Sequence, residues 1–305
     1  MRLNILNQKF RGYIELIRPF TLLAPVIVSS CIIIASFFYN SHQGSFISYM
    51  WAMILPASVS LAILNGASNA LNQVTDLKTD KISKPYRPIP KGIISIKEGI
   101  IVSIMMYLVA FLLAFQINLM FLIFVSLITV FTVTYSLPPR LKDRLIFNQL
   151  WVGIPRGLLG ILASWSVFGN SFESLPLTIG LIAMLFLIGG SITKDITDSK
   201  ADRQTGTYTL VNTYGRKKAA IIALPFMFFP FVFIPLLTES GIIEPQFIIL
   251  TFLAIPSYFI FRSMVKDRNK GKVLENTYSW ALMYVTYFIF ASSFSFLVIM
   301  GSVIS

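Results

Sequence analysis

Long apolar runs alternate with short polar segments along the whole chain. Nine runs approach the length of about 20 residues that a helix needs to cross a bilayer. They cover residues 21–39, 48–71, 99–115, 119–137, 146–168, 176–193, 219–237, 246–261 and 279–303. The first run lacks a small-residue cleavage signature, so we expect a membrane helix and not a removed signal peptide. The pattern predicts an all-α polytopic membrane protein with nine transmembrane helices.

The composition favours a membrane protein over a soluble one. Of the 305 residues, 55% are hydrophobic and only 12% are charged, and the mean hydropathy is +0.75. Soluble domains carry about 25% charged residues. A single cysteine, Cys31, and a single histidine, His42, exclude a disulfide framework and a histidine-cluster metal site. We expect residues 1–305 to form one integral-membrane domain without an obligate protein partner.

The distribution of lysine and arginine predicts the topology. If the N-terminus lies inside, 24 of the 25 basic residues fall in inner segments, whereas the outer connections near 40–47, 116–118, 169–175 and 238–245 hold none. This bias is the positive-inside rule. It predicts a cytoplasmic N-terminus and explains the net charge of +12 without nucleic acid. The remaining cation, Arg156, lies inside the fifth run, where a charge is costly and usually functional or paired.

A polar stretch interrupts the apolar pattern at the inner end of the second run. Asn72, Asp76 and Asp80 follow at four-residue intervals, so a helix presents all three on one face. Carboxylates that lie close together repel each other unless a cation separates them. Hard divalent ions take such oxygen ligands, and Mg2+ usually completes its shell with substrate phosphates. Asn65 and Asn69 either extend this face inward or form hydrogen bonds between helices.

A second acidic face follows at the inner end of the sixth run. Asp195, Asp198 and Asp202 have i, i+3, i+7 spacing, which again places them on one side of a helix. Each acidic face precedes a basic loop with glycine or proline, at 81–92 and 203–206. We therefore expect two pseudo-repeated helical halves around a central cavity. One such motif alone is most often a solvated helix end, but two matched motifs on the inner side indicate a functional site.

The residue types indicate a metal–diphosphate site that faces the cytoplasm. Mg2+ held between the two faces would bind a diphosphate and make it a better leaving group. Lysine and arginine would neutralise the phosphate charge, and the candidates by position are Lys81, Lys84, Arg87, Arg140, Lys142, Lys194 and Arg203. Departure from an allylic carbon leaves a carbocation, which each aromatic face stabilises by about 0.5–2 kcal/mol. The chain supplies 27 Phe, 12 Tyr and 4 Trp.

These motifs resemble the signatures of the UbiA superfamily of intramembrane prenyltransferases. The stretch 72–92, with Asn-x3-Asp-x3-Asp and then Lys-Pro-Tyr-Arg-Pro-Ile-Pro-Lys-Gly, is similar to the first signature. The stretch 194–210, Lys-Asp-x2-Asp-x3-Asp-Arg-x2-Gly-x2-Thr-Leu, is similar to the second. Tyr135, Ser136 and Lys142 resemble the characteristic segment between the fourth and fifth helices. With the nine runs, the resemblance extends over essentially the whole chain.

The resemblance implies Mg2+-dependent transfer of a polyprenyl group from its diphosphate to a lipophilic or aromatic acceptor within the membrane, with release of diphosphate. The metal ligands that it implies are Asn72, Asp76, Asp195 and Asp198, which are also the catalytic residues, followed by Asp80 and Asp202. The diphosphate contacts, from the resemblance and from position, are Lys81, Lys84, Arg87, Tyr135, Ser136, Lys142, Lys194 and Arg203. No base for the proton of the acceptor is singled out.

The branch of the family, and with it the acceptor, stays open. The segment 84–90, together with the Tyr-Ser-x-Pro-Pro sequence, is similar to chlorophyll and bacteriochlorophyll synthases. The second motif is similar to digeranylgeranylglyceryl phosphate synthases and homogentisate prenyltransferases, except that Ala201 stands where many relatives have glycine. The product would thus belong to lipid, quinone or tetrapyrrole biosynthesis. We expect a bacterial or archaeal cell membrane.

Two other functions fit parts of the pattern. A membrane transporter with an acidic cation or phosphate site also carries acidic residues in its helices, but such sites tend to lie at the bilayer midplane in broken helices. A CDP-alcohol phosphotransferase also combines Asp-rich helices with Mg2+, but it concentrates its motif in one helix pair. Both acidic motifs of this chain stand at helix ends beside basic loops, which favours phosphate capture by a prenyltransferase.

Overall fold

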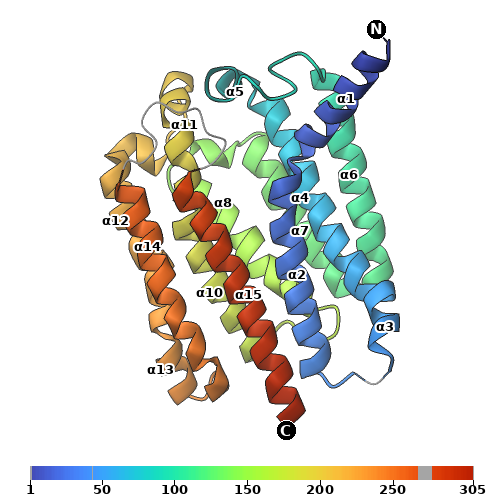
Figure 1. Ribbon diagram of the computed structural model, residues 1–305, viewed down its shortest axis with the longest axis vertical. Coiled ribbons are helices and arrows are strands. Elements are labelled where there is room, and N and C mark those ends of the chain that lie inside the picture. Colours follow the sequence, from blue (N-terminus) through green and yellow to red (C-terminus); the bar gives the residue numbers. More distant parts are fainter. Residues whose placement is uncertain (1, 43, 267–276, 305) are drawn as a thin grey trace.

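The computed structural model describes residues 2–42, 44–266 and 277–304, and all regular structure in these ranges is helical (Figure 1). The elements up to the middle of the chain are α1 (Arg2–Ile17), α2 (Pro19–Tyr39), α3 (Phe46–Tyr49), the π-helix η1 (Met50–Ile54), α4 (Leu55–Thr75), α5 (Leu77–Ser83), α6 (Ile96–Ile117) and α7 (Leu119–Ser136). Those that follow are the 3-10 helix η2 (Leu141–Asp143), α8 (Phe147–Gly153), the π-helix η3 (Ile154–Leu159), α9 (Gly160–Trp165), α10 (Ser174–Gly190), α11 (Ile192–Thr205), α12 (Leu210–Val232), α13 (Ile234–Glu239), the 3-10 helix η4 (Pro245–Leu253), α14 (Ala254–Val265) and α15 (Tyr278–Ile304).

Eight helices of the described ranges are long and apolar enough to cross a membrane, several of them continuous through more than one element. They are Pro19–Tyr39, Phe46–Thr75, Ile96–Ile117, Leu119–Ser136, Ser174–Thr205, Leu210–Glu239, Pro245–Val265 and Tyr278–Ser302. Each corresponds to one of the nine predicted runs. The all-α architecture is thereby confirmed for the described residues, and the eight helices agree with a polytopic membrane protein.

The fifth predicted run, 146–168, has a different character. It forms α8, η3 and α9 in immediate succession and is not among the eight long apolar helices. Pro155 lacks the backbone N–H that a regular helix needs, and a π-helical turn occupies this point. Arg156 follows it directly. The sequence pattern located this segment, but its helix is irregular.

The helices close into a ring around the middle of the bundle. Helix α2 packs against α4, α4 against α7, and α7 against η3 and α9. On the other side η3 packs against α10, α10 against α12, α12 against α14, and α14 against α15. Helix α15 returns to α2, so segments from the two ends of the chain lie side by side (Figure 1). The segment α8–η3–α9 thus stands between the first half of the ring, formed by α2, α4 and α7, and the second half, formed by α10, α12, α14 and α15.

Small residues bring α6 close to α4, while large apolar residues of α6 face outward. Gly99 and Ser103 on the buried face of α6 allow this approach, and the Ser103 Oγ donates to the Ala67 carbonyl at 2.9 Å. Such packing of small residues is typical of membrane helices. On the opposite face, Leu112 and Phe115 are 65% and 76% exposed. Outward apolar side chains are favourable where lipid replaces water.

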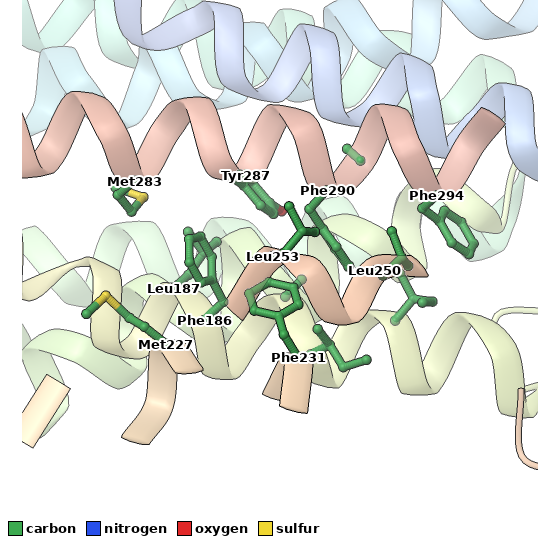
Figure 2. Packing of buried hydrophobic residues seen from close by; sticks show 14 of the residues in the cluster. Phe186, Leu187, Met227, Phe231, Leu250, Leu253, Met283, Tyr287, Phe290 and Phe294 are labelled. Atoms are coloured by element: carbon green, nitrogen blue, oxygen red, sulfur yellow. The ribbon is translucent and has the colours of Figure 1, made fainter. Parts of the chain in front are cut away.

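The largest buried cluster lies among α10, α12, η4 and α15 (Figure 2). Phe231 of α12 stands between Phe186 of α10 and Phe290 of α15, with ring centroids 5.5 and 5.8 Å away and edge-on geometry in both pairs. Edge-to-face packing is the favourable arrangement for aromatic rings. This cluster fixes the second half of the ring against α15.

The two acidic segments lie at the same end of the bundle. Helix α5 and helix α11 contact each other there, at the end of the bundle where α1 also lies (Figure 1). They are far apart in the sequence, and the ring brings them together. The functional residues of both motifs therefore meet at one end of a common interior.

Candidate active site

The first motif keeps its predicted helical face although α4 ends before Asp76. The Asp76 amide donates to the Asn72 carbonyl at 2.9 Å, and the Asp80 amide donates to the Asp76 carbonyl at 2.8 Å. These bonds continue the i to i−4 pattern across the junction between α4 and α5. Asn72, Asp76 and Asp80 consequently all line one cavity.

Amide side chains of α4 fix this helix against the start of the chain. The Asn69 Nδ2 donates to the Thr21 Oγ1 at 2.8 Å and to the Ile17 carbonyl at 2.9 Å, and the Gln73 Nε2 donates to the Leu16 carbonyl at 2.8 Å. These carbonyls lie near Arg18, where a left-handed residue with φ 55° separates α1 from α2. Asn69 thus forms interhelical hydrogen bonds, and it also lines the same cavity as Asn72, so both roles considered for it agree with the structure.

Residues after α7 cover the first motif. The Lys142 Nζ lies 2.5 Å from Asp76 Oδ1, and the Arg140 Nη2 lies 3.2 Å from the same oxygen. The Asn72 Oδ1 accepts from the Ser136 Oγ at 2.6 Å and from Lys142 at 3.2 Å. Burial lowers the pKa of the Lys142 ammonium, and the Asp76 carboxylate opposes this shift.

The loop after α5 supplies a cation to each motif. The Arg87 Nη1 binds both oxygens of Asp80, at 2.8 and 3.0 Å, and both side chains are buried. Burial raises the pKa of Asp80, and the Arg87 guanidinium opposes the rise. Lys84 reaches across to the second motif, where its Nζ lies 2.5 and 2.7 Å from the oxygens of Asp198. One loop thereby connects the two acidic segments.

Asp195 of the second motif is turned toward α8. Its Oδ2 accepts hydrogen bonds from the Asn148 Nδ2 and the Gln149 Nε2, both at 3.0 Å, and its exposed fraction is only 4%. The neighbouring Lys194 bonds to the Tyr135 hydroxyl and to the Asn148 Oδ1. This carboxylate links α11 to the segment α8–η3–α9.

A polar cavity collects much of the predicted site. The predicted residues that line it are Asn72, Asp76, Asp80, Lys84, Arg87, Tyr135, Lys142, Lys194 and Asp198. Further cations, Arg18 and Arg156, line it as well. Six cationic side chains thus face three carboxylates, which leaves an excess of three positive charges. Such an excess suits an anionic ligand.

Six predicted residues do not line this cavity, and one of them is Arg140, which is bonded to Asp76. Ser136 adjoins it through Asn72, and Asp195 and Asp202 are buried, whereas Lys81 and Arg203 are exposed. Their assigned roles as metal ligands or diphosphate contacts stay predictions. The helical spacing gave Asp195, Asp198 and Asp202 one common side of α11, but only Asp198 reaches the cavity.

An apolar cavity adjoins the polar one. Leu61, Leu64, Ile128 and Leu187 contribute to its walls. Several residues border both cavities, and they are Thr21, Thr132, Val152, Pro155, Arg156, Ser191, Met283 and Tyr284. The bundle therefore contains a cationic chamber that continues into an apolar one.

The polar cavity contains the type of donor atom that a hard divalent ion prefers. Asn72, Asp76 and Asp198 offer the oxygen ligands that Mg2+ prefers. Among the described residues, no three acidic, histidine or cysteine side chains are gathered closely enough to hold a metal ion by themselves. Lys84, Lys142 and Arg140 instead occupy the carboxylate oxygens. An anionic ligand that drew these cations away would leave the oxygens available.

Sequence reasoning missed the partners of Asp195 and the contribution of Arg18. Asn148 and Gln149 stand at the start of a predicted membrane run, and two adjacent buried amides at that position were the available signal. Arg18 was counted only as an inner basic residue, because nothing in the sequence indicates that the chain turns there toward α4.

The helical ring and its paired cavities define a membrane protein with an internal site for an anion that carries an apolar chain. The model of the UbiA prenyltransferase family matches residues 22–284, so the chain belongs to this family. The predicted family and enzyme class, a UbiA-type prenyltransferase, are thus confirmed. Membership does not support the transporter or the CDP-alcohol phosphotransferase considered above.

Two curated relatives of the chain carry the same name. The chain is 29% identical over 263 residues to the digeranylgeranylglyceryl phosphate synthase of Methanosphaera stadtmanae. The aligned region covers 85% of this chain and 89% of that protein. It is 30% identical over 231 residues to the synthase of the same name from Methanococcus aeolicus, covering 76% and 78%. The similarity therefore extends over most of both relatives.

Solved structures share the fold at low sequence identity. A UbiA homologue from Archaeoglobus fulgidus bound to DMAPP and Mg2+ superposes with a TM-score of 0.66 at 17% identity, over 95% of this chain and 99% of that one. A structure of digeranylgeranylglyceryl phosphate synthase superposes with a TM-score of 0.65 at 20% identity, over 97% and 99%. The helical arrangement is accordingly that of the family.

Proposed function

We propose that the protein transfers a polyprenyl group from a polyprenyl diphosphate to the hydroxyl of a glycerophosphate lipid in a Mg2+-dependent reaction. The observation that carries this proposal is the cationic cavity that opens into an apolar one. A polyprenyl diphosphate has a matching structure, because its diphosphate is anionic and its hydrocarbon chain is apolar. The names of the curated relatives support a glyceryl phosphate acceptor over an aromatic one.

The metal site is part of this proposal. Asn72, Asp76 and Asp198 would hold Mg2+, with Asp80 nearby and phosphate oxygens completing the shell. When bound, the metal supplies charge that makes the diphosphate a better leaving group. The A. fulgidus homologue that binds DMAPP and Mg2+ supports this assignment. Asp195 and Asp202 are kept as candidate ligands from the resemblance.

The remaining groups orient the donor. Lys84 and Lys142, which now contact Asp198 and Asp76, would move from these carboxylates to the diphosphate, and Lys194, which now contacts Tyr135, would bind it as well. The chain of the donor would lie in the apolar cavity. The bond between the allylic carbon and the diphosphate oxygen breaks with its electron pair on the diphosphate. The acceptor hydroxyl then forms the new carbon–oxygen bond and releases its proton.

Charge at the allylic carbon would develop beside aromatic rings. Tyr284 borders both cavities, and its ring centroid lies 4.1 Å from that of Trp280, which lines the polar one. Tyr287 lines the apolar cavity on the same helix. Rings at this boundary would stabilise a carbocation while excluding water.

The topology belongs to the same proposal. We count α8–η3–α9 as a ninth, irregular crossing between the first and second halves of the ring. The N-terminus and the polar cavity would face the cytoplasm, in agreement with the concentration of basic residues at that end. Residues 1–305 would form one prenyltransferase domain.

The proposed function predicts a product and a metal requirement. Purified protein with geranylgeranyl diphosphate, geranylgeranylglyceryl phosphate and Mg2+ should yield a lipid with a second prenyl ether, detected by mass, and diphosphate. EDTA should abolish both, and Asp76→Asn should lower diphosphate release by at least about 100-fold, because a metal ligand is lost. Glu239→Gln, exposed at the opposite end of the bundle, is the matched control. Full activity in EDTA would contradict the metal assignment.

The acceptor panel tests the lipid assignment. Hydroxybenzoate, homogentisate and a chlorophyllide should give no prenylated product under the same conditions. A product with one of these acceptors and none with the glyceryl phosphate would replace the proposed acceptor while leaving the family assignment intact.

A further inference from the structure

Arg156 is a charge in the middle of a membrane-crossing segment. It stands midway along α8–η3–α9 and belongs to the π-helix η3. Its side chain is exposed, and it borders both the polar and the apolar cavity. The exposure is therefore to the interior space of the bundle. A cation at this depth is costly unless an anion accompanies it.

The neighbours of Arg156 hold its backbone against the second half of the ring. A Cβ at Gly157 would meet the Met184 Cα at 2.4 Å, and one at Gly153 would meet the Met184 carbonyl oxygen at 2.9 Å. Glycine is therefore required for this close approach to α10. The Tyr287 hydroxyl donates to the Arg156 carbonyl at 3.0 Å. The backbone is thus fixed from two sides, with the side chain bordering both cavities.

A purely structural arginine would be paired with the protein. Buried or semi-buried guanidinium groups normally bind carboxylates or carbonyl oxygens. In residues 2–42, 44–266 and 277–304, the Arg156 guanidinium has no hydrogen bond or ion pair. The carboxylates of the polar cavity are paired with other cations. Arg156 is therefore available for an anion that enters the cavity.

The position of Arg156 at the boundary of the two cavities indicates that it contacts the acceptor and not the diphosphate of the donor. The proposed donor would have its diphosphate at the acidic motifs and its chain in the apolar cavity, so the reacting carbon would lie near the boundary that Arg156 lines. A bare cation there would oppose the developing carbocation. An acceptor must reach the same carbon, and an anionic group on that acceptor would both neutralise Arg156 and be held by it.

The geometry points to Arg156 as the residue that binds the phosphate of the acceptor and selects acidic over neutral acceptors. This inference rests on the proposed function for the identity of the acceptor. The planar guanidinium binds a phosphate with two parallel hydrogen bonds, which lysine cannot reproduce. Because glyceryl phosphate has its hydroxyl a few bonds from the phosphate, the same contact would orient the nucleophile toward the allylic carbon.

The test compares a phosphate acceptor with its neutral counterpart. Wild type, Arg156→Gln, Arg156→Lys and the control Arg144→Gln are assayed with geranylgeranyl diphosphate and either geranylgeranylglyceryl phosphate or geranylgeranylglycerol. Arg144 is exposed and lines neither cavity. Arg156→Gln should raise KM for the phosphate acceptor by about 10–100-fold, the loss expected for a charged hydrogen-bonded contact. KM for the donor should change less than about twofold. Turnover of the neutral acceptor should stay the same or rise, because the substitution removes a bare cation that opposes the carbocation.

Further readouts separate binding from folding and from the proposed function. Stabilisation of the metal-free protein against heat by geranylgeranylglyceryl phosphate alone should be lost in Arg156→Gln and partly kept in Arg156→Lys. If the glutamine variant does not fold, the lysine variant must show a smaller rise of KM that is again confined to the phosphate acceptor. A rise of KM for the donor, an equal loss with both acceptors, or unchanged stabilisation by the phosphate lipid would overturn the inference.

The proposed function fails in a different way. Wild-type protein would then transfer to neither glyceryl lipid. If it prenylates hydroxybenzoate instead, the methyl ester serves as the neutral counterpart, and Arg156→Gln should impair the acid alone. An equal effect on acid and ester would reject a role of Arg156 in binding the acidic group of any acceptor.

Discussion

The two acidic motifs have similar sequences but different surroundings. In the first, Asn72, Asp76 and Asp80 all line the polar cavity, and both carboxylates are paired with cations. In the second, only Asp198 does so, while Asp195 accepts from two amides of α8. The first motif is thus directed wholly at the cavity, and the second divides its carboxylates between the cavity and the support of a neighbouring helix.

The difference follows from the position of each helix in the ring. Helix α4 and helix α5 lie beside the loop that carries Arg87 and the segment that carries Lys142, so both carboxylates of their polar face meet cations. Helix α11 contacts α5 and α12. Its Asp198 is bonded to Lys84, whereas its Asp195 is bonded to Asn148 and Gln149 of α8. Spacing alone does not reveal a second neighbour.

The largest expected difference between the motifs is catalytic. Asp198→Asn should lower Mg2+-dependent diphosphate release by at least about 100-fold, because Asp198 reaches the cavity. Asp195→Asn should cost about 10-fold, the size typical of a supporting residue. Release of diphosphate from geranylgeranyl diphosphate at saturating Mg2+ measures both. A greater loss for Asp195→Asn would make Asp195 the direct ligand that the resemblance implies, and would remove the distinction drawn between the motifs.

The next effect concerns stability in the first motif. Arg87→Met removes the cation bonded to both oxygens of buried Asp80. Leaving a buried carboxylate without its partner costs about 3–5 kcal/mol. Thermal unfolding in detergent, compared with Lys91→Met on the same loop, measures the loss. Lys91 is exposed, and its replacement should change stability by less than about 0.5 kcal/mol. Equal behaviour of the two variants would show that the pair does not stabilise the fold.

The smallest effect tests the support of α8 by the second motif. Gln149→Ala removes one hydrogen bond to Asp195 but also removes a buried Gln149 Oε1 that has no partner. The two changes offset in part, so we expect a loss of about 1 kcal/mol. Gln204→Ala, exposed on α11, should be neutral in the same unfolding measurement. A loss of diphosphate release without a loss of stability would assign Gln149 to the active site instead.

The membrane helices, the shared face of the first motif and the family could all be predicted from the sequence. Apolar runs locate membrane helices because their length must match the bilayer, and eight of the nine runs became long apolar helices. The four-residue spacing of Asn72, Asp76 and Asp80 determined a shared face because helical periodicity is local. The amino-acid sequences of the two motifs were sufficient to identify the family.

Only the tertiary structure decided which oxygens face the cavity. The pairing of Asp195 with Asn148 and Gln149 joins segments nearly fifty residues apart, and no local rule selects it. The exposure of Arg156 to both cavities depends on the close approach of Gly153 and Gly157 to α10. Periodicity fixes which residues share a side of a helix, whereas the neighbour on that side is set by how the whole ring closes.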